Sequence, residues 1–108
     1  MSAGARIAAR YRGYDSAKLR ATRPNIRNPR CVAAIDIVLT ERMESHQRGY
    51  DAGQVLLDVL GGLDVREMHD RAIEAVERQN RARQYVEAEQ SQGMADALWE
   101  WIQDRSDT

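Results

Sequence analysis

The amino-acid sequence predicts an all-α fold: a small bundle of four to five helices that pairs as a homodimer and carries a basic N-terminal arm. Three observations favour this fold. Apolar residues recur three and four positions apart over most of the chain, which is the spacing of one helix face. Residues that typically begin and end helices separate these stretches. The chain has 108 residues, of which 43% are hydrophobic and 31% charged, as expected of one globular domain.

The chain is predicted to have two parts, a basic N-terminal arm at residues 1–28 and a helical bundle domain at residues 29–108. Within the arm, residues 3–12 have the spacing of a short helix that ends at Gly13. Two prolines and two asparagines mark residues 14–30 as an extended or turning connector with no apolar face of its own. We therefore expect this part of the arm to become ordered by docking on another surface.

The first bundle helix is predicted to begin at Asn28, which can cap it, with Pro29 as its first residue. A β-strand is the competing interpretation, because apolar residues alternate over residues 33–39. The helix is preferred because of this start signal and because helical spacing continues in the polar residues that follow. The residues expected on or beside its buried face are Val32, Ala34, Ile35, Val38, Leu39, Met43 and His46.

A second bundle helix is predicted at residues 52–60, because Gly49 would end the first helix and Asp51 could cap the next. Gly61 and Gly62 would end the second helix, since glycine readily adopts the left-handed conformation found there. The residues expected on one face of this helix are Val55, Leu56, Val59 and Leu60.

The third bundle helix is predicted to start with an Asp variant of the capping box, formed by Asp64 and Glu67. A break at Ser91 or Gly93 would separate it from a last helix at residues 94–104. The third helix is expected to pack through a seam of mostly small residues spaced as in a coiled coil, which comprises Val65, Met68, Ala72, Ala75, Gln79, Ala82 and Val86. The large apolar residues of the last helix are Leu98, Trp99, Trp101 and Ile102.

Charge is divided unevenly along a chain whose net charge is −1. Residues 1–30 hold eight basic side chains and one acid, whereas residues 31–108 hold eight basic side chains and sixteen acids. Such an arm could bind phosphates, with Tyr11 and Tyr14 stacking on unpaired bases, or it could dock on the acidic part of the chain. The basic residues expected to contact nucleic acid or an acidic surface are Arg6, Arg10, Arg12, Lys18, Arg20, Arg23, Arg27 and Arg30.

One carboxylate interrupts the most apolar part of the sequence. Asp36 stands between Ile35 and Ile37, and two interpretations are open. It lies on the one solvent-facing strip of its helix, or it bonds to an arginine of the basic arm or of a partner. A buried and unpaired carboxylate would instead have a raised pKa.

No motif in the sequence predicts a catalytic, metal or cofactor site, and we expect a protein that is not an enzyme. His46 and His69 are far apart and lack the ligand spacing of known metal motifs. The single cysteine, Cys31, has no neighbouring histidine to activate it and can form no internal disulfide, which fits a reducing cytoplasmic setting. No apolar stretch approaches the roughly 18 residues that span a bilayer, so no membrane partner is expected.

The aromatic C-terminus is the feature that most favours an interaction with another protein. Trp99 and Trp101 point about 200° apart on a helix, so one of them should lie at the rim of the fold or in an interface. The sequence thus predicts a small regulator or inhibitor of the type carried by phages and mobile elements, binding a protein with a basic working surface. A nucleic-acid-binding regulator is the alternative. The expected partner-binding residues are Trp99, Trp101, Asp96, Glu100 and Asp104.

Overall fold

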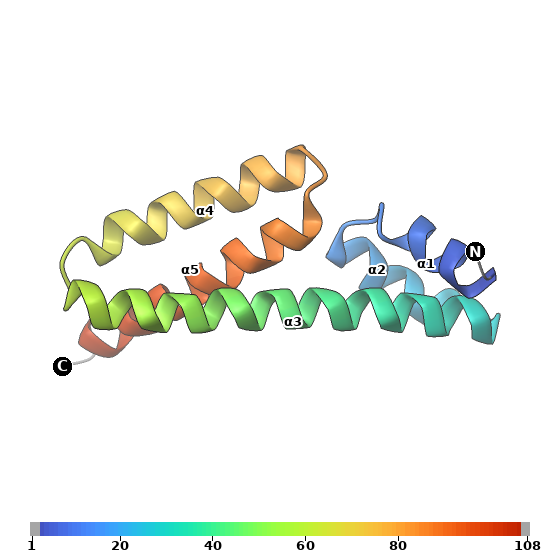
Figure 1. The fold of residues 1–108 in the computed structure, drawn as a ribbon, viewed down its shortest axis with the longest axis horizontal. Helices are drawn as coiled ribbons and strands as arrows, with labels where there is room; N and C mark the ends of the chain where they lie inside the picture. The colour runs from blue at the N-terminus through green and yellow to red at the C-terminus, as the bar shows by residue number, and fades with distance from the viewer. Residues whose placement is uncertain (1–2, 107–108) are drawn as a thin grey trace.

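The computed structural model describes residues 3–106, and this part of the chain is all-α, as the sequence predicts (Figure 1). One long helix forms the axis of a molecule that measures 50 × 26 × 20 Å. The helices are α1 (Ala3–Tyr11), α2 (Ser16–Thr22), the 3-10 helix η1 (Arg23–Asn25), α3 (Pro29–Leu60), α4 (Val65–Arg81) and α5 (Tyr85–Ser106). α1 and α2 lie against one half of α3, while α5 lies against the other half and α4 packs on α5 (Figure 1).

The long helix α3 begins where the sequence predicts. The side chain of Asn28 accepts a hydrogen bond from the N–H of Arg30 at 2.9 Å, and Pro29 occupies the first helical position. The predicted end at Gly49 is wrong, however, because α3 continues for 32 residues to Leu60. Asp51 lies inside this helix and caps nothing; its carboxylate accepts a hydrogen bond from Gln47 at 2.9 Å.

The glycines inside α3 and α5 are contact points between the two helices rather than breaks. A methyl group on Gly49 would come within 1.8 Å of the carbonyl oxygen of Gln90 in α5. A methyl group on Gly93 in α5 would come within 1.9 Å of the carbonyl oxygen of His46. A methyl group on Gly53 would likewise come within 2.8 Å of the Cβ atom of Ala97. Two backbones can approach this closely only where side chains are absent or very small.

The turn after α3 confirms one prediction and corrects another. Gly61 ends the helix in the left-handed conformation at φ 60°. Asp64, in contrast, makes no capping hydrogen bond to α4, because its own backbone is left-handed at φ 58° and an N-cap residue needs an extended backbone. Glu67 is also not part of a capping box, since its carboxylate pairs with Arg71 at 2.8 Å.

The turn between α4 and α5 comes earlier than predicted. α4 ends at Arg81, and Arg83 adopts the left-handed conformation at φ 60°. The N–H of Arg83 bonds to the carbonyl oxygen of Asn80 at 3.1 Å, and the N–H of Gln84 to that of Gln79 at 2.8 Å. These are the two hydrogen bonds of a Schellman motif, with an arginine at the position that glycine usually occupies.

This early turn changes the two helices on either side of it. Ser91 and Gly93 lie within α5 rather than between two helices. Ala82 and Val86 are exposed, so the predicted seam does not extend beyond the end of α4. Its first half is correct, since Val65 and Ala72 are buried and Met68, Ala75 and Gln79 are partly buried.

The basic arm is more ordered than an extended connector. Asp15 caps α2 by accepting a hydrogen bond from the N–H of Lys18 at 2.7 Å. Leu19 in α2 is fully buried, which shows that this part of the arm does have an apolar side chain to bury. The N-terminal core comprises Ala8, Tyr11, Leu19, Ala34, Ile35 and Val38, with Cys31 and Leu39 among the residues packed beside it.

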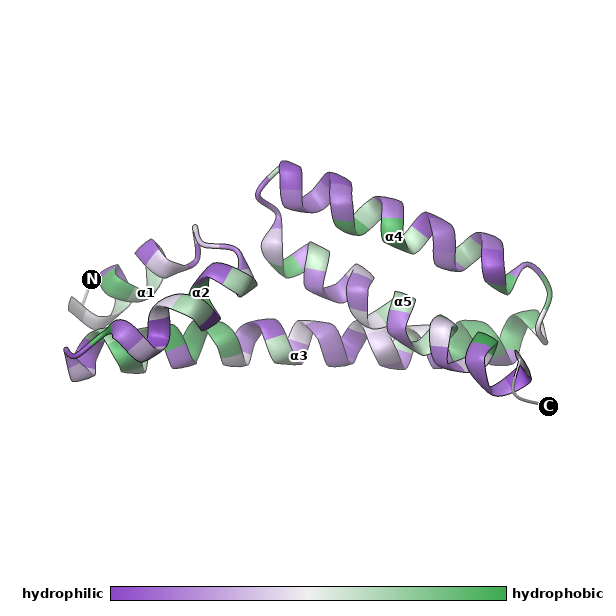
Figure 2. Ribbon diagram, turned by 180° about the vertical axis from the view of Figure 1, so that it is seen from behind, coloured by the Kyte–Doolittle hydropathy of each residue, from purple (hydrophilic) through white to green (hydrophobic). Residues whose placement is uncertain are grey.

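A second apolar core lies at the opposite end of α3, and the middle of α3 is hydrophilic (Figure 2). The residues of this C-terminal core are Leu57, Val65, Leu98 and Ile102, with Leu56, Met68, Met94 and Trp101 packed against them. α3 therefore joins two packing centres and belongs to both.

The buried face of α3 departs from the predicted one beyond Val38. Ala34, Ile35 and Val38 are buried as expected. The next buried residues of α3 are Arg42, Ser45 and Gly49. Met43, in contrast, is 67% exposed, and His46 is only partly buried. Further along, Val55 and Val59 face solvent, at 62% and 76% exposed, and do not pack with Leu57 in the core. The sequence pattern missed this shift because the central contacts use small and polar residues.

Candidate functional site

The outward face of α5 holds most of the residues that the sequence nominated for partner binding. Two sides of α5 are occupied: Gly93 and Ala97 meet α3, while Leu98 and Ile102 belong to the C-terminal core. At about 100° per residue, the remaining side carries Asp96, Trp99, Glu100 and Gln103. α5 as a whole has five acidic side chains and one basic side chain. This face is therefore acidic and contains one large aromatic residue.

Trp99 is the exposed tryptophan. Trp99 is 47% exposed to solvent. The rest of the indole packs on His69 of α4, with ring centroids 5.3 Å apart and ring planes inclined by 34°. An indole held in place by one neighbour and open on its other side loses little conformational freedom when a partner covers it.

Trp101 lies on the other side of α5, as the predicted separation of the two tryptophans requires. Its ring packs against the C-terminal core, close enough to Gly62 that a methyl group there would be 2.8 Å from the ring. The guanidinium of Arg105 lies over the ring at 4.2 Å from its centroid. Trp101 thus stabilises the fold and is not brought together with Trp99.

The carboxylates of α5 are held along its border with α3. Asp96 Oδ2 lies 2.7 Å from His46 Nε2, and Asp96 Oδ1 accepts a hydrogen bond from Gln92 at 2.9 Å. The hydroxyl of Tyr50 donates to Glu100, and this hydrogen bond to a carboxylate raises the pKa of Tyr50. Asp96 and Glu100 therefore point toward α3 in fixed positions, while Asp104 lies exposed one helical turn beyond Glu100.

A hollow adjoins this acidic row where the two halves of the molecule meet. Its volume is about 650 Å³, and its wall includes residues from α2, α3, α4 and α5. Three of these, Arg20, His46 and Glu89, also line a smaller hollow of about 280 Å³ beside it. The acidic and basic residues of the larger hollow are Asp15, Arg20, His46 and Glu89. Its mixed charge and open shape do not single out one ligand.

Two arginines of the arm are paired with acids of α3. The guanidinium of Arg12 donates to both carboxylate oxygens of Glu41, at 2.6 and 3.0 Å. Arg23 donates in the same way to Asp36, at 2.5 and 3.0 Å. The predicted pairing of Asp36 with an arginine of the arm is thereby confirmed. These hydrogen bonds lower the pKa of both Asp36 and Glu41.

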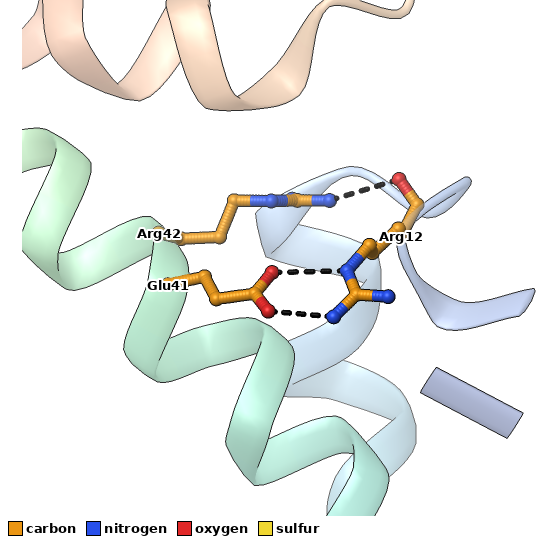
Figure 3. A network of polar contacts seen from close by, with 3 residues as sticks. All are labelled: Arg12, Glu41 and Arg42. Carbon is orange, nitrogen blue, oxygen red and sulfur yellow. Dashed lines mark hydrogen bonds and ion pairs between the residues drawn. The ribbon is translucent and has the colours of Figure 1, made fainter. Parts of the chain in front are cut away.

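The residue that sequence reasoning missed is Arg42, whose exposed fraction is only 1%. Its guanidinium donates to the carbonyl oxygen of Arg12 at 3.2 Å (Figure 3). It also donates to the carbonyl oxygen of Tyr14 at 2.7 Å and to Ser16 Oγ at 3.0 Å. The ring of Tyr85 lies 5.1 Å from the guanidinium. Burial lowers the pKa of Arg42, yet a guanidinium remains protonated in proteins. The available signal was its place in the row Val38, Arg42, Ser45 and Gly49.

The remaining basic residues of the arm are more accessible. Lys18 lies over the ring of Tyr14, 4.1 Å from its centroid. Among the residues that the structure describes, the other five are exposed and form no ion pair: Arg6, Arg10, Arg20, Arg27 and Arg30. They are distributed over α1, α2, the connection between η1 and α3, and the start of α3, so the surface they form follows the arm rather than a single helix.

Two further observations concern residues 3–106. Their histidine, cysteine, aspartate and glutamate side chains form no group of three or more that could hold a metal ion. None of the helices combines the length and the hydropathy needed to cross a membrane.

Comparison of the chain with known protein families, curated proteins and solved structures gives no match in any of the three.

Proposed function

We propose that this protein is a non-catalytic regulator that binds another protein through the outward face of α5. The observation that carries the proposal is Trp99, an indole that is 47% exposed and anchored on His69. Tryptophan is enriched among the few residues that dominate binding energy in protein interfaces. The carboxylates of Asp96 and Glu100 lie next to it on the same face, held by His46 and Tyr50.

The charge of this face favours a partner with a basic surface. Complementary charges accelerate encounter and suppress wrong partners more than they add affinity. A protein whose working site handles nucleic acid has such a surface, and covering that site would inhibit it. We therefore propose an inhibitor of the kind found in phages and mobile elements. We propose a cytoplasmic location because a chain with one cysteine forms no internal disulfide, as is usual for proteins of that reducing compartment.

The proposal is tested by capturing partners with the full chain and with two matched variants. Trp99→Ala should weaken binding of the captured protein by a factor of about 30 or more, since interface tryptophans often contribute 2 kcal/mol or more. Val86→Ala, at a residue 39% exposed at the start of α5, should bind like the parent chain. Equal binding by Trp99→Ala and the parent chain would contradict the proposed site.

Nucleic-acid binding is a second candidate, favoured by the five exposed arginines of the arm. Removing residues 1–28 would be a poor test, because it would uncover Arg42 and the N-terminal core. Replacing Arg6, Arg10, Arg20, Arg27 and Arg30 by glutamine is a sharper one. If these residues bind phosphates, the parent chain should show a log–log salt dependence with a slope of about −4.5, which the variant should lose.

Self-association is the remaining part of the proposal. Besides Trp99, the molecule exposes large apolar residues on α3 and on the turn that follows it: Ile37, Met43, Val55, Val59 and Leu63. These residues are spread along α3, and exposed apolar side chains of this size can be covered by a second chain that lies along the helix. We propose that the protein forms a homodimer through α3, separately from the partner face on α5.

A further inference from the structure

The solvent-facing stripe of α3 has a symmetric arrangement of residues. Six exposed positions form three pairs, and the two members of each pair are equally far from the level of His46, one on each side along the helix. Two pairs are apolar, Ala33 with Val59 and Ile37 with Val55, and one is charged, Glu44 with Arg48. At 100° per residue all six positions fall within an arc of about 80°. They extend over about 39 Å, at 1.5 Å per residue, and so occupy most of the helix.

The apolar members of the stripe are open to solvent. Ile37 is 51% exposed, Val55 62% and Val59 76%. Ile37 stays half exposed even though the arm forms ion pairs with Asp36 and Glu41, which lie before and after it in α3. Apolar residues are thus exposed toward both ends of one helix face, and charged residues occupy its centre.

The charged centre of the stripe has no internal partner. Among the ion pairs of residues 3–106, none involves Glu44 or Arg48, although the two are one helical turn apart. Asp51, on the same face, accepts a hydrogen bond from Gln47. Two opposite charges therefore remain available on a surface whose ends are apolar.

We infer that α3 packs antiparallel against α3 of a second copy of this chain, around a two-fold axis that crosses the exposed stripe at the level of His46, whose side chain points to the opposite side of the helix, toward Asp96 of α5. In an isologous dimer, residue i contacts residue j of the other copy and residue j contacts residue i. The stripe meets this condition. Ile37 lies opposite Val55 of the second copy and Ala33 opposite Val59, while Glu44 lies opposite Arg48 in two symmetric pairs. This inference rests on the proposed self-association and adds its orientation and register.

The distribution of charge over the whole chain favours the same orientation. The arm, which together with the start of α3 supplies the eight basic residues of positions 1–30, lies along one half of the molecule (Figure 1), and residues 31–108 carry twice as many acids as basic residues. An antiparallel pair brings the basic end of each copy to the acidic end of the other, whereas a parallel pair brings like charges together. In this register Asp51 lies opposite Glu41 of the second copy, and the guanidinium of Arg12, which is bonded to that Glu41, offsets the like charge; the Arg12 side chain is 46% exposed.

The first test is the oligomeric state of the full chain and of charge-reversed variants, measured by sedimentation equilibrium. The parent chain should be a dimer at micromolar concentration. Glu44→Arg and Arg48→Glu should each weaken the dimer by about tenfold or more through like-charge contacts, and the double variant should recover it. Glu67→Arg, which reverses an exposed charge on α4, should dimerise like the parent chain.

The second test determines orientation by disulfide cross-linking, with Cys31→Ser as background. A mixture of Ile37→Cys and Val55→Cys chains should form a cross-linked dimer on mild oxidation, whereas either chain alone should not. A monomeric parent chain would overturn both the inference and the proposed self-association. A dimer that ignores the charge reversals, or one in which Ile37→Cys cross-links by itself, would overturn the register alone.

Discussion

Arg42 is the residue on which the attachment of the arm depends most. A fully buried guanidinium has lost its hydration, and here three oxygens from the segment between α1 and α2 replace the lost water. Two of these are backbone carbonyls, so the arginine recognises the shape of the arm more than its sequence. Because the same side chain contacts Tyr85, it also ties the arm to the start of α5.

Replacing Arg42 with methionine should detach the arm. The substitution keeps most of the side-chain volume but leaves the carbonyl oxygens of Arg12 and Tyr14 buried without a donor. Each such acceptor costs about 1–3 kcal/mol, so we expect the free energy of unfolding to fall by about 2–6 kcal/mol. Urea denaturation measures this change, and amide hydrogen exchange should show that α1 and α2 lose protection first. Arg66→Met, at an exposed position in α4, is the matched control and should change stability by less than about 0.5 kcal/mol.

Arg83 offers a substitution that should stabilise the chain. It holds the left-handed position of the turn between α4 and α5, where a side chain is disfavoured by about 1–2 kcal/mol relative to glycine. Arg83→Gly should therefore raise the free energy of unfolding by up to about 1 kcal/mol, since added flexibility of the unfolded chain offsets part of the gain. Thermal unfolding followed by circular dichroism measures it. Arg81→Gly, inside the last turn of α4, should instead be destabilising, and a loss of stability in Arg83→Gly would contradict this account.

At the scale of the helices, the contact between α3 and α5 depends on the absence of side chains. Gly93→Ala should lower the free energy of unfolding by about 1–3 kcal/mol, because its methyl group would meet backbone atoms of His46 and Tyr50 that cannot easily move. Gly4→Ala is the control: no atom lies within 4 Å of its added methyl group, so it should be neutral or slightly stabilising. Equal stability of the Gly93→Ala and parent chains would mean that the helices are not this close.

The same contact shows how much of the fold the sequence could predict. Asn28, Pro29 and Gly61 act on their immediate neighbours, so the ends of α3 could be inferred from local chemistry. Gly49 could not be interpreted correctly in this way. Whether a glycine ends a helix or admits another one depends on a residue far away in the sequence, here Gln90.

The candidate site was predictable to a similar extent. Helix geometry alone separates Trp99 from Trp101, but which of them is exposed depends on where α4 lies. The pairing of Asp36 could be proposed because a carboxylate between two isoleucines needs a partner. Arg42 gave a weaker signal, since an arginine in a helix is ordinarily solvated and its acceptors come from a turn whose conformation the sequence pattern did not reveal.

At the scale of the whole molecule, the N-terminal arm and the C-terminal helices are held to α3 by different means. α5 approaches α3 with closely spaced backbones, and α4 and α5 share the C-terminal apolar core with the end of α3. The arm adds to its own apolar core the buried Arg42 and two exposed ion pairs, Arg12 with Glu41 and Arg23 with Asp36. Salt and acid should weaken the exposed ion pairs and so loosen the attachment of the arm. They should affect the packing of α4 and α5 less.

Acid should therefore release the arm before the rest of the molecule unfolds. In the folded chain, the hydrogen bonds from Arg23 and Arg12 lower the pKa of Asp36 and Glu41 below their ordinary values of 3.8 and 4.5. Because the pKa of each carboxyl group is lower in the folded chain than in the unfolded chain, the ion pair stabilises the folded chain fully at a pH above the ordinary pKa. This stabilisation is lost as the pH falls through the pKa of the folded chain. NMR amide signals of α1 and α2 should shift toward unfolded positions below about pH 4, while those of α4 and α5 stay native.

The Asp36→Asn, Glu41→Gln double variant should have a weakly held arm at neutral pH and lose most of this acid response, whereas Glu67→Gln should retain it. An arm whose signals remain native down to about pH 3 would show that Arg42 and the N-terminal core suffice to hold it.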